Sequence, residues 1–264
     1  MTKDDLTSAD QLRNTAGWNQ TLTDWNRLLR YQPDGCFVAT LDDRIVGTVT
    51  TTCYPATDGG PTLAWIGMML VDADFRRQGI GTLLMTRALE VLATAEIDCI
   101  KLDATPTGAP VYEHLGFKTE WAFHRWTKAL PPTDFNQPAS SQPLPSLELD
   151  HAAFGMDRSR WLKMLADDST VVSRDNSFGM LRSGSTASYL GPITATSDSV
   201  AIQIINDLLS GVSGIVYWDI PACEQLARQL GFEPVRDLTR MWTGQRLIEP
   251  NLNLQFALSD PGTG

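Results

Sequence analysis

Apolar and polar positions follow helix-like and strand-like periods in turn along the first half of the chain. Tryptophans and leucines recur at helical spacing over 8–29, and a second helix is predicted at 81–95. β-Branched and aromatic runs predict strands, and a polar Asp-Asp-Arg stretch between two of them indicates a hairpin. The predicted strands are 36–41, 44–54, 63–71, 97–103 and 117–128, with a short helix at 111–116 before the last. Strands interleaved with helices indicate an α/β or α+β sheet domain.

The second half of the chain repeats part of this order. It reads as a helix at 199–211, a buried strand at 214–219, a helix at 221–231 and a strand at 232–244. The stretch LDATPTGAPVYEHLGF in the first half matches WDIPACEQLARQLGF in the second. In both, an Asp is soon followed by Pro, then by a helix and by Leu-Gly-Phe. The shared order predicts a duplicated fold.

A segment rich in Pro, Ser and Gln divides the chain at 131–146 and has no hydrophobic period, which predicts a linker. It separates a domain at 1–130 from another at 147–249, each of ordinary size. The remaining residues, 250–264, end in SDPGTG and are expected to form a loosely held tail.

Composition narrows the classes of protein. Of the 264 residues, 42% are hydrophobic and 20% charged, as in soluble globular proteins. The net charge of −10 argues against nucleic acid or an anionic membrane as partner, since both reward a basic face. The four cysteines lie far apart and no histidine spacing suits zinc, so we expect reduced thiols, no metal and a cytoplasmic protein.

The stretch DFRRQGIGTLL, residues 74–84, has the composition of a phosphate-binding loop before a helix. A P-loop is excluded because no Lys follows Gly81. A dinucleotide turn is disfavoured because Leu84 stands where the third glycine would be, which also argues against an NAD-dependent oxidoreductase. The pattern [RQ]-x-x-G-x-[GA] is satisfied, and its glycines and helix N-terminus suit a pyrophosphate. A glycine-containing turn with two solvated arginines is the alternative.

With its flanking strand and helix, and with VYEHLGF about 30 residues later, this loop resembles the GNAT superfamily of N-acetyltransferases. The resemblance implies two domains, each a mixed, mostly antiparallel sheet flanked by helices, and acetyl-CoA as co-substrate. It also implies that the strand at 63–71 offers backbone groups to the pantetheine arm, with Gly67 at a bulge that opens a slot. The implied cofactor-binding residues are Met69, Leu70, Val71, Arg76, Arg77, Gln78, Gly79, Ile80, Gly81, Thr82, Thr105 and Tyr112.

GWNQT, LDATP and YLGPITA resemble a subgroup of that superfamily with a second, degenerate acetyltransferase-like domain. Where the loop of the second half should lie, the chain reads TATSDS, without Arg or a glycine pair. We therefore expect the second domain to bind no CoA and to complete the substrate pocket or to brace the first domain.

Acetyl transfer needs a neutral amine and a proton for the departing thiolate. Tyr112 occupies the position of the superfamily's catalytic tyrosine and is the predicted acid, with a core aromatic residue as the alternative. Thr105 stands where many members carry Asn. Asp103 is the predicted base or amine anchor, although it could equally cap the turn that follows. Its counterpart Asp219 lies in a domain without the loop, which favours a structural role for both.

Residues near the N-terminus resemble the subgroup's substrate-facing segment. The candidates for the substrate pocket are Trp18, Gln20, Asp24 and Tyr54, with Asp58 as a weaker one. The expected function is N-acetylation of a small-molecule amine, such as an amino-acid-like metabolite, by a monomer or homodimer. A non-catalytic acyl-CoA-binding or sensory module is the alternative.

Overall fold

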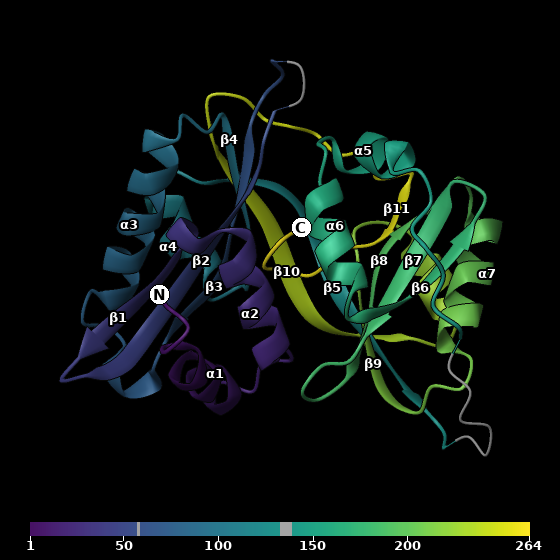
Figure 1. Ribbon diagram of the computed structural model, residues 1–264, viewed down its shortest axis with the longest axis horizontal. Helices are drawn as coiled ribbons and strands as arrows, with labels where there is room; N and C mark the ends of the chain where they lie inside the picture. Colours follow the sequence, from purple (N-terminus) through teal and green to yellow (C-terminus); the bar gives the residue numbers. More distant parts are fainter. Residues whose placement is uncertain (57–58, 133–138) are drawn as a thin grey trace.

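A computed structural model describes residues 1–56, 59–132 and 139–264. The described strands form one sheet that runs through both halves of the chain in the order β1-β2-β3-β4-β10-β5-β9-β8-β7-β6, with β11 beside β8. Figure 1 shows the two halves side by side, with β10 and β5 between them.

The first half is built as its periodicity predicts. Three antiparallel strands are followed by β4, which lies parallel to β3. Helix α3 packs on one face of this sheet, while α1 and α2 cover the other. The strands are β1 (Cys36–Leu41), β2 (Arg44–Tyr54), β3 (Leu63–Val71), β4 (Cys99–Ala104) and β5 (Lys118–Leu130). The helices are α1 (Leu6–Thr15), α2 (Leu22–Tyr31), α3 (Ile80–Thr94) and α4 (Ala109–His114).

The second half repeats this arrangement, which confirms the expected duplication of the fold. Strands β6, β7 and β8 are antiparallel, and β9 lies parallel to β8. The strands are β6 (Ser169–Arg174), β7 (Ser177–Arg182), β8 (Ser188–Thr194), β9 (Gly214–Ile220), β10 (Glu233–Gly244) and β11 (Gln255–Ala257). The helices are α5 (Glu148–Phe154), α6 (Ser159–Ala166), α7 (Asp198–Leu209) and α8 (Glu224–Gln229).

The two halves exchange their last long strands. β10, from the second half, pairs with β4 of the first, and β5, from the first half, pairs with β9 of the second. The exchanged strands also pair with each other, which joins the two sheets into one. Neither half of the sequence therefore completes its own sheet.

A bidentate ion pair holds each exchanged strand to its new neighbour. Arg240 of β10 donates to both carboxylate oxygens of Asp103 on β4, at 2.9 Å each. Arg125 of β5 does the same to Asp219 of β9, at 2.7 Å. The two aspartates occupy equivalent places in the repeat, and each one binds an arginine of the strand that the other half supplies.

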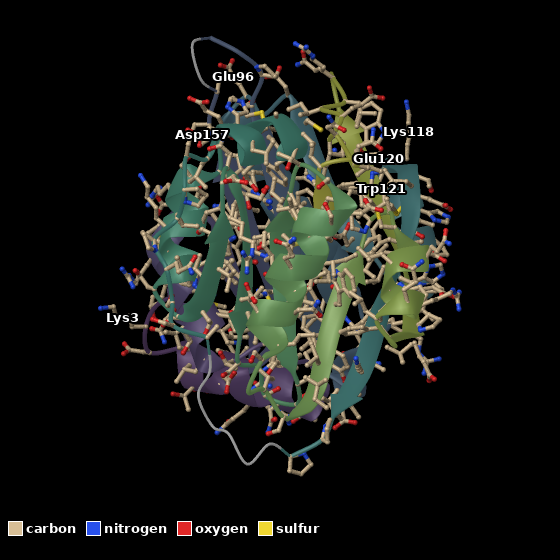
Figure 2. The ribbon with its side chains drawn as sticks, turned by 90° about the vertical axis from the view of Figure 1, so that its right-hand side faces the viewer. Lys3, Glu96, Lys118, Glu120, Trp121 and Asp157 are labelled. Carbon is tan, nitrogen blue, oxygen red and sulfur yellow. The ribbon has the colours of Figure 1, made fainter. Side chains whose placement is uncertain are left out.

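A third ion pair reaches from β4 to β5 across β10. Lys101 contacts Glu120 at 2.9 Å, and both side chains are buried. Figure 2 shows Glu120 near Lys118 and Trp121, along the first residues of β5.

The C-terminal segment is firmly held, so the expectation of a loose tail is wrong. β11 pairs with β8, and Trp218 donates its indole N–H to Phe256 O at 2.8 Å. Leu258 N–H then donates to the carbonyl of Asp219 on β9. The segment thus contacts both β8 and β9 where their own pairing has ended at Leu190 and Trp218. The expectation rested on the polar ending SDPGTG, whereas Phe256 and its neighbours are buried.

Beyond β11 the tail crosses to the first half and passes close to β3. Tyr54 donates its hydroxyl to Thr263 O at 2.6 Å, and Trp65 donates to Pro261 O at 3.1 Å. A Cβ added to Gly67 would lie 2.3 Å from Gly262 O, far inside van der Waals contact. The close approach of the tail therefore requires glycine at position 67.

Gly67→Ala should lower the free energy of unfolding by about 1 to 3 kcal/mol, because the tail backbone must move. For a chain of this size we expect the Tm to fall by roughly 2 to 10 °C, measured by calorimetry. Gly81→Ala is the matched control, since its added Cβ would meet the flexible end of Met69 at 3.2 Å and Val71 at an ordinary contact distance of 3.7 Å. Equal Tm values for the two variants would contradict the close contact.

Candidate active site

A cavity of about 700 Å³ opens at the loop before α3 and extends between the two halves of the chain. Its size is typical of ligand and cofactor sites. Among the residues that the sequence singled out, it is lined by Trp18, Gln20, Met69, Val71, Arg76, Arg77, Gly79, Ile80, Gly81, Thr82, Asp103, Thr105 and Tyr112.

The loop at the mouth of the cavity has the geometry of an anion site. Gly79 caps α3 with φ +83°, and Arg77 is also in the left-handed region, with φ +61°. The first N–H groups of α3 have no acceptors within the helix and carry its partial positive charge. Arg76 donates through Nε to Val71 O at 3.1 Å, which orients its guanidinium. These residues fit a pyrophosphate, and no carboxylate lines this end of the cavity in the described parts of the chain.

β3 and β4 separate beside the loop. Their parallel pairing covers only Leu63–Trp65 against Cys99–Lys101. Next along β3 lies a bulge, where Met68 adopts φ +50° and its carbonyl accepts from the Thr48 hydroxyl at 2.7 Å. The expected bulge is therefore present, but it lies at Met68–Met69 rather than at Gly67. The unpaired edge of β3 fits an extended arm that needs backbone partners.

Tyr112 lies on α4 at the inner part of the cavity and packs against Phe117, with ring centroids 6.1 Å apart. Burial raises the pKa of its phenol to about 12, so the hydroxyl carries its proton at neutral pH. Thr105 uses its hydroxyl to accept from Gly108 N–H at 3.1 Å, which fixes the turn into α4. The side chain of Thr105 thus supports the helix that carries Tyr112.

Asp103 also reaches the cavity, but both of its oxygens are bound by Arg240. Burial raises its pKa to about 6, against the lowering effect of Arg240. The guanidinium of Arg240 is itself stacked between Trp65 and Trp121, 4.4 Å from each ring centroid. This geometry anchors β10, and the charge of Asp103 is already paired with a cation of the protein.

The opposite wall comes from the N-terminal region and from the second half. Asn19 binds the loop before β8, accepting from Thr186 N–H at 3.0 Å and donating to Ala187 O at 3.0 Å. Trp18 and Gln20, on either side of Asn19, line the cavity as expected. The second half completes the wall with Tyr217, Val235, Arg236 and Leu238, beside Arg125 of β5.

Four predicted site residues do not line the cavity: Asp24, Tyr54, Leu70 and Gln78. Asp24 accepts from Thr21 N–H at the start of α2 and pairs with Arg27 at 2.7 Å. Although burial opposes it, Arg182 and Arg27 hold the pKa of Asp24 below its usual value. Tyr54 is fully buried against the tail, and Leu70 packs in a core cluster on the other side of β3. Asp58 lies outside the described residues.

Sequence reasoning missed Arg125, Tyr217 and Arg236. The internal repeat could have pointed to Arg125, because an arginine precedes Trp-Thr by one or two residues in both β5 (HRWT) and β10 (RMWT). Pairing those arginines with Asp103 and Asp219 would have suggested the exchange of strands. No sequence signal marks Arg236, since its position depends on that exchange.

The second half has no equivalent of the phosphate loop. After β8 only three residues precede α7, and Ser197 caps this helix by accepting from Val200 N–H. The tail segment lies beside β8 where the first half has its open slot. Among the described residues no cluster suits a metal ion, and no helix is long and apolar enough to span a bilayer.

Three antiparallel strands followed by a parallel fourth occur in both halves, and the first half adds the glycine loop before α3 and the separating strand pair β3 and β4. The acetyltransferase (GNAT) domain family matches residues 32–119, and a second family of the same description matches 146–257. The matches fall in both halves, and the chain belongs to the GNAT acetyltransferases.

Individual relatives agree with this assignment. The chain is 32% identical to the uncharacterized N-acetyltransferase YitH of Bacillus subtilis (strain 168), over 61% of each protein. It thus matches less than two thirds of that relative's length. A solved structure of a proposed acetyltransferase from Pyrococcus horikoshii is similar over 100% of this chain and 94% of that one, with 26% identity and a TM-score of 0.83. The GCN5-related N-acetyltransferase of Sphaerobacter thermophilus shares the fold, with 12% identity, a TM-score of 0.60 and 96% of each chain covered.

Proposed function

We propose that the protein is an acetyl-CoA-dependent N-acetyltransferase that acetylates the amine of a small molecule. The observation that carries this proposal is the continuous cavity, which runs from the phosphate loop past the open edge of β3 to Tyr112 and on to the second half. The end at the loop before α3 suits the cofactor. The end at the second half is lined by Tyr217, Val235 and Arg236, to which we assign no cofactor contact. The second half would then complete the acceptor site.

Acetyl-CoA would supply an activated acetyl group as a thioester. The loop residues Arg76 to Thr82 would hold its phosphates, and the edge of β3 would orient its arm. Tyr112, protonated at neutral pH, would donate its proton to the departing sulfur. We assign Asp103 to positioning β10, because Arg240 occupies both of its oxygens.

Deprotonation of the amine would depend on desolvation in the cavity. An ordinary alkylamine titrates near 10.4, and a low-dielectric site lowers the pKa of an amine. In the described parts of the chain, no unpaired carboxylate lines the cavity to hold the ammonium form. Activity is therefore expected to rise with pH between about 7 and 9.

Release of the thiol from acetyl-CoA, measured with a panel of small amines, tests the proposal, with products identified by mass spectrometry. Formation of an acetylated amine at a rate well above the protein-free control is the expected result. Tight CoA binding without any acetylated product would instead identify a non-catalytic acyl-CoA-binding module.

Arg77→Gln should raise the KM for acetyl-CoA about fivefold to tenfold, because one charge-assisted contact to phosphate is lost. The kcat and the KM for the amine should stay unchanged, since the substitution removes binding common to ground and transition states. Steady-state kinetics with each substrate varied in turn measures these constants. Arg87→Gln on the exposed face of α3 is the matched control. An unchanged KM for acetyl-CoA in Arg77→Gln would place the phosphates elsewhere.

A further inference from the structure

The wall that the second half gives to the cavity carries a cation without a counter-ion. Arg236 of β10 lines the cavity, and no carboxylate among the described residues forms an ion pair with it. Partial desolvation and the neighbouring Arg125 lower the pKa of its guanidinium, while Asp219 and Tyr217 act in the opposite direction, and the residue as a whole is exposed. Arg236 thus presents a solvated guanidinium to the cavity, where it is available to an anion.

The register of the exchanged strands creates this situation. Arg236 on β10 is the direct partner of Arg125 on β5. Like charges directly opposite each other across two strands destabilise a sheet.

Nearby carboxylates are already engaged. Asp219 binds Arg125 through both oxygens and also accepts from the Tyr189 hydroxyl. Asp237, the next residue along β10, faces His124 at 3.3 Å. Arg125 is therefore neutralised and Arg236 is not.

A tyrosine hydroxyl and two apolar side chains line the same cavity as Arg236 and could contact a small molecule there. Tyr217 of β9 lines the same cavity, and its hydroxyl has no hydrogen-bond partner among the described residues. The guanidinium of Arg125 lies 5.2 Å from the centroid of the Tyr217 ring and orients it. Val111 and Val235 expose apolar side chains to the cavity, 50% and 54% accessible.

The Arg236 guanidinium and the Tyr217 hydroxyl together suit a ligand group with a single negative charge. The phosphates of this fold have their own loop, with two arginines, glycines and a helix N-terminus. Arg236 instead lies on a strand, opposite Arg125 of β5. A guanidinium binds the planar carboxylate through two parallel hydrogen bonds.

We propose that the acceptor amine carries a carboxylate, which Arg236 binds with help from the Tyr217 hydroxyl. The inference rests on the proposed acetyltransferase function and narrows its substrate to amino acids and related amino carboxylates. The net charge of −10 alone would suggest a cationic acceptor. Arg236 instead indicates an acceptor with a negatively charged group, because the charges that line the cavity determine what binds there.

Matched pairs of acceptors test this inference. Each of the common α-amino acids is offered beside its carboxamide, with saturating acetyl-CoA, and acetylated products are quantified. We expect the wild type to prefer at least one free amino acid over its amide by about 30-fold or more in kcat/KM. Arg236→Gln should remove that preference and leave the KM for acetyl-CoA unchanged. Arg236→Lys should restore part of it, and Arg87→Gln should behave as the wild type.

Binding without turnover separates this inference from the proposed function. Calorimetric titration of CoA-saturated protein with N-acetyl amino acids and their amides should show the same preference, lost in Arg236→Gln. This preference without acetylation of any amine would overturn the proposed function and keep the carboxylate site. Equal binding and equal turnover of acids and amides, or an equal loss of both in Arg236→Gln, would overturn the carboxylate site alone.

Discussion

Replacing Tyr112 by phenylalanine is expected to lower kcat about 100- to 10,000-fold, the range that a positioned acid contributes. The affinity for CoA should change less than about twofold, because Phe keeps the packing against Phe117 and lacks only the hydroxyl. Single-turnover acetylation measures the chemical step, and calorimetric titration measures CoA binding.

The pH dependence of the acetylation rate distinguishes a catalytic acid at Tyr112 from an aromatic residue that only packs in the core. Burial raises the pKa of Tyr112 to about 12, so the phenol stays protonated throughout the range in which the amine loses its proton. The wild-type rate should therefore rise with pH without a decline below about pH 10. Tyr217→Phe is the comparison, because it removes a hydroxyl that we assign to acceptor binding and should raise the KM for the acceptor without the large fall in kcat. A near-normal kcat in Tyr112→Phe would remove this residue from catalysis.

Arg240→Ala is expected to lower the free energy of unfolding by about 3 to 5 kcal/mol, the usual cost of leaving a buried charge unpaired. Asp103 would lose both hydrogen bonds, and Trp65 and Trp121 would lose the cation between their rings. For a chain of this length the Tm should fall by roughly 6 to 20 °C.

Removing both charges tests whether the loss arises from the unpaired carboxylate. Asp103→Leu combined with Arg240→Met should be much more stable than the sum of the single variants predicts. Arg174→Ala is the matched control, because its ion pair with Asp207 is exposed and should contribute less than about 1 kcal/mol. A Tm change of less than 2 °C in Arg240→Ala would show that the pair does not hold β10.

Local patterns predicted most helices and strands well. The alternation of 3.6-residue and two-residue periods gave α3, β2 and β3 to within a residue or two. The loop before α3 could be singled out because its motif consists of contiguous residues, and its glycine cap lies where the motif places it, while its binding of phosphate stays a prediction. Trp18 and Gln20 were likewise found from a short local resemblance.

Long-range pairing could not be predicted in the same way. Either β5 or β10 could pair with β4 and bury the same side of its own strand. The pattern of apolar and polar residues therefore does not predict which of the two strands lies beside β4. The tail was missed because few of its residues are apolar, although its backbone is bound by β8 and by Trp218. Arg236 followed from neither motif nor period, since only the paired exchanged strands bring it opposite Arg125.

The exchange of β5 and β10 has a consequence during synthesis on the ribosome. β4 emerges early, but its permanent partner ends about 110 residues after β5. At typical elongation rates β10 is complete roughly 6 to 22 s after β5, and the edge of β4 waits longer still. During that interval β5 is the nearest strand able to cover it, and folding must later release β5 to the second half. A nascent chain halted before residue 233 would therefore lack the permanent partner of β4 and the cavity wall that β10 provides.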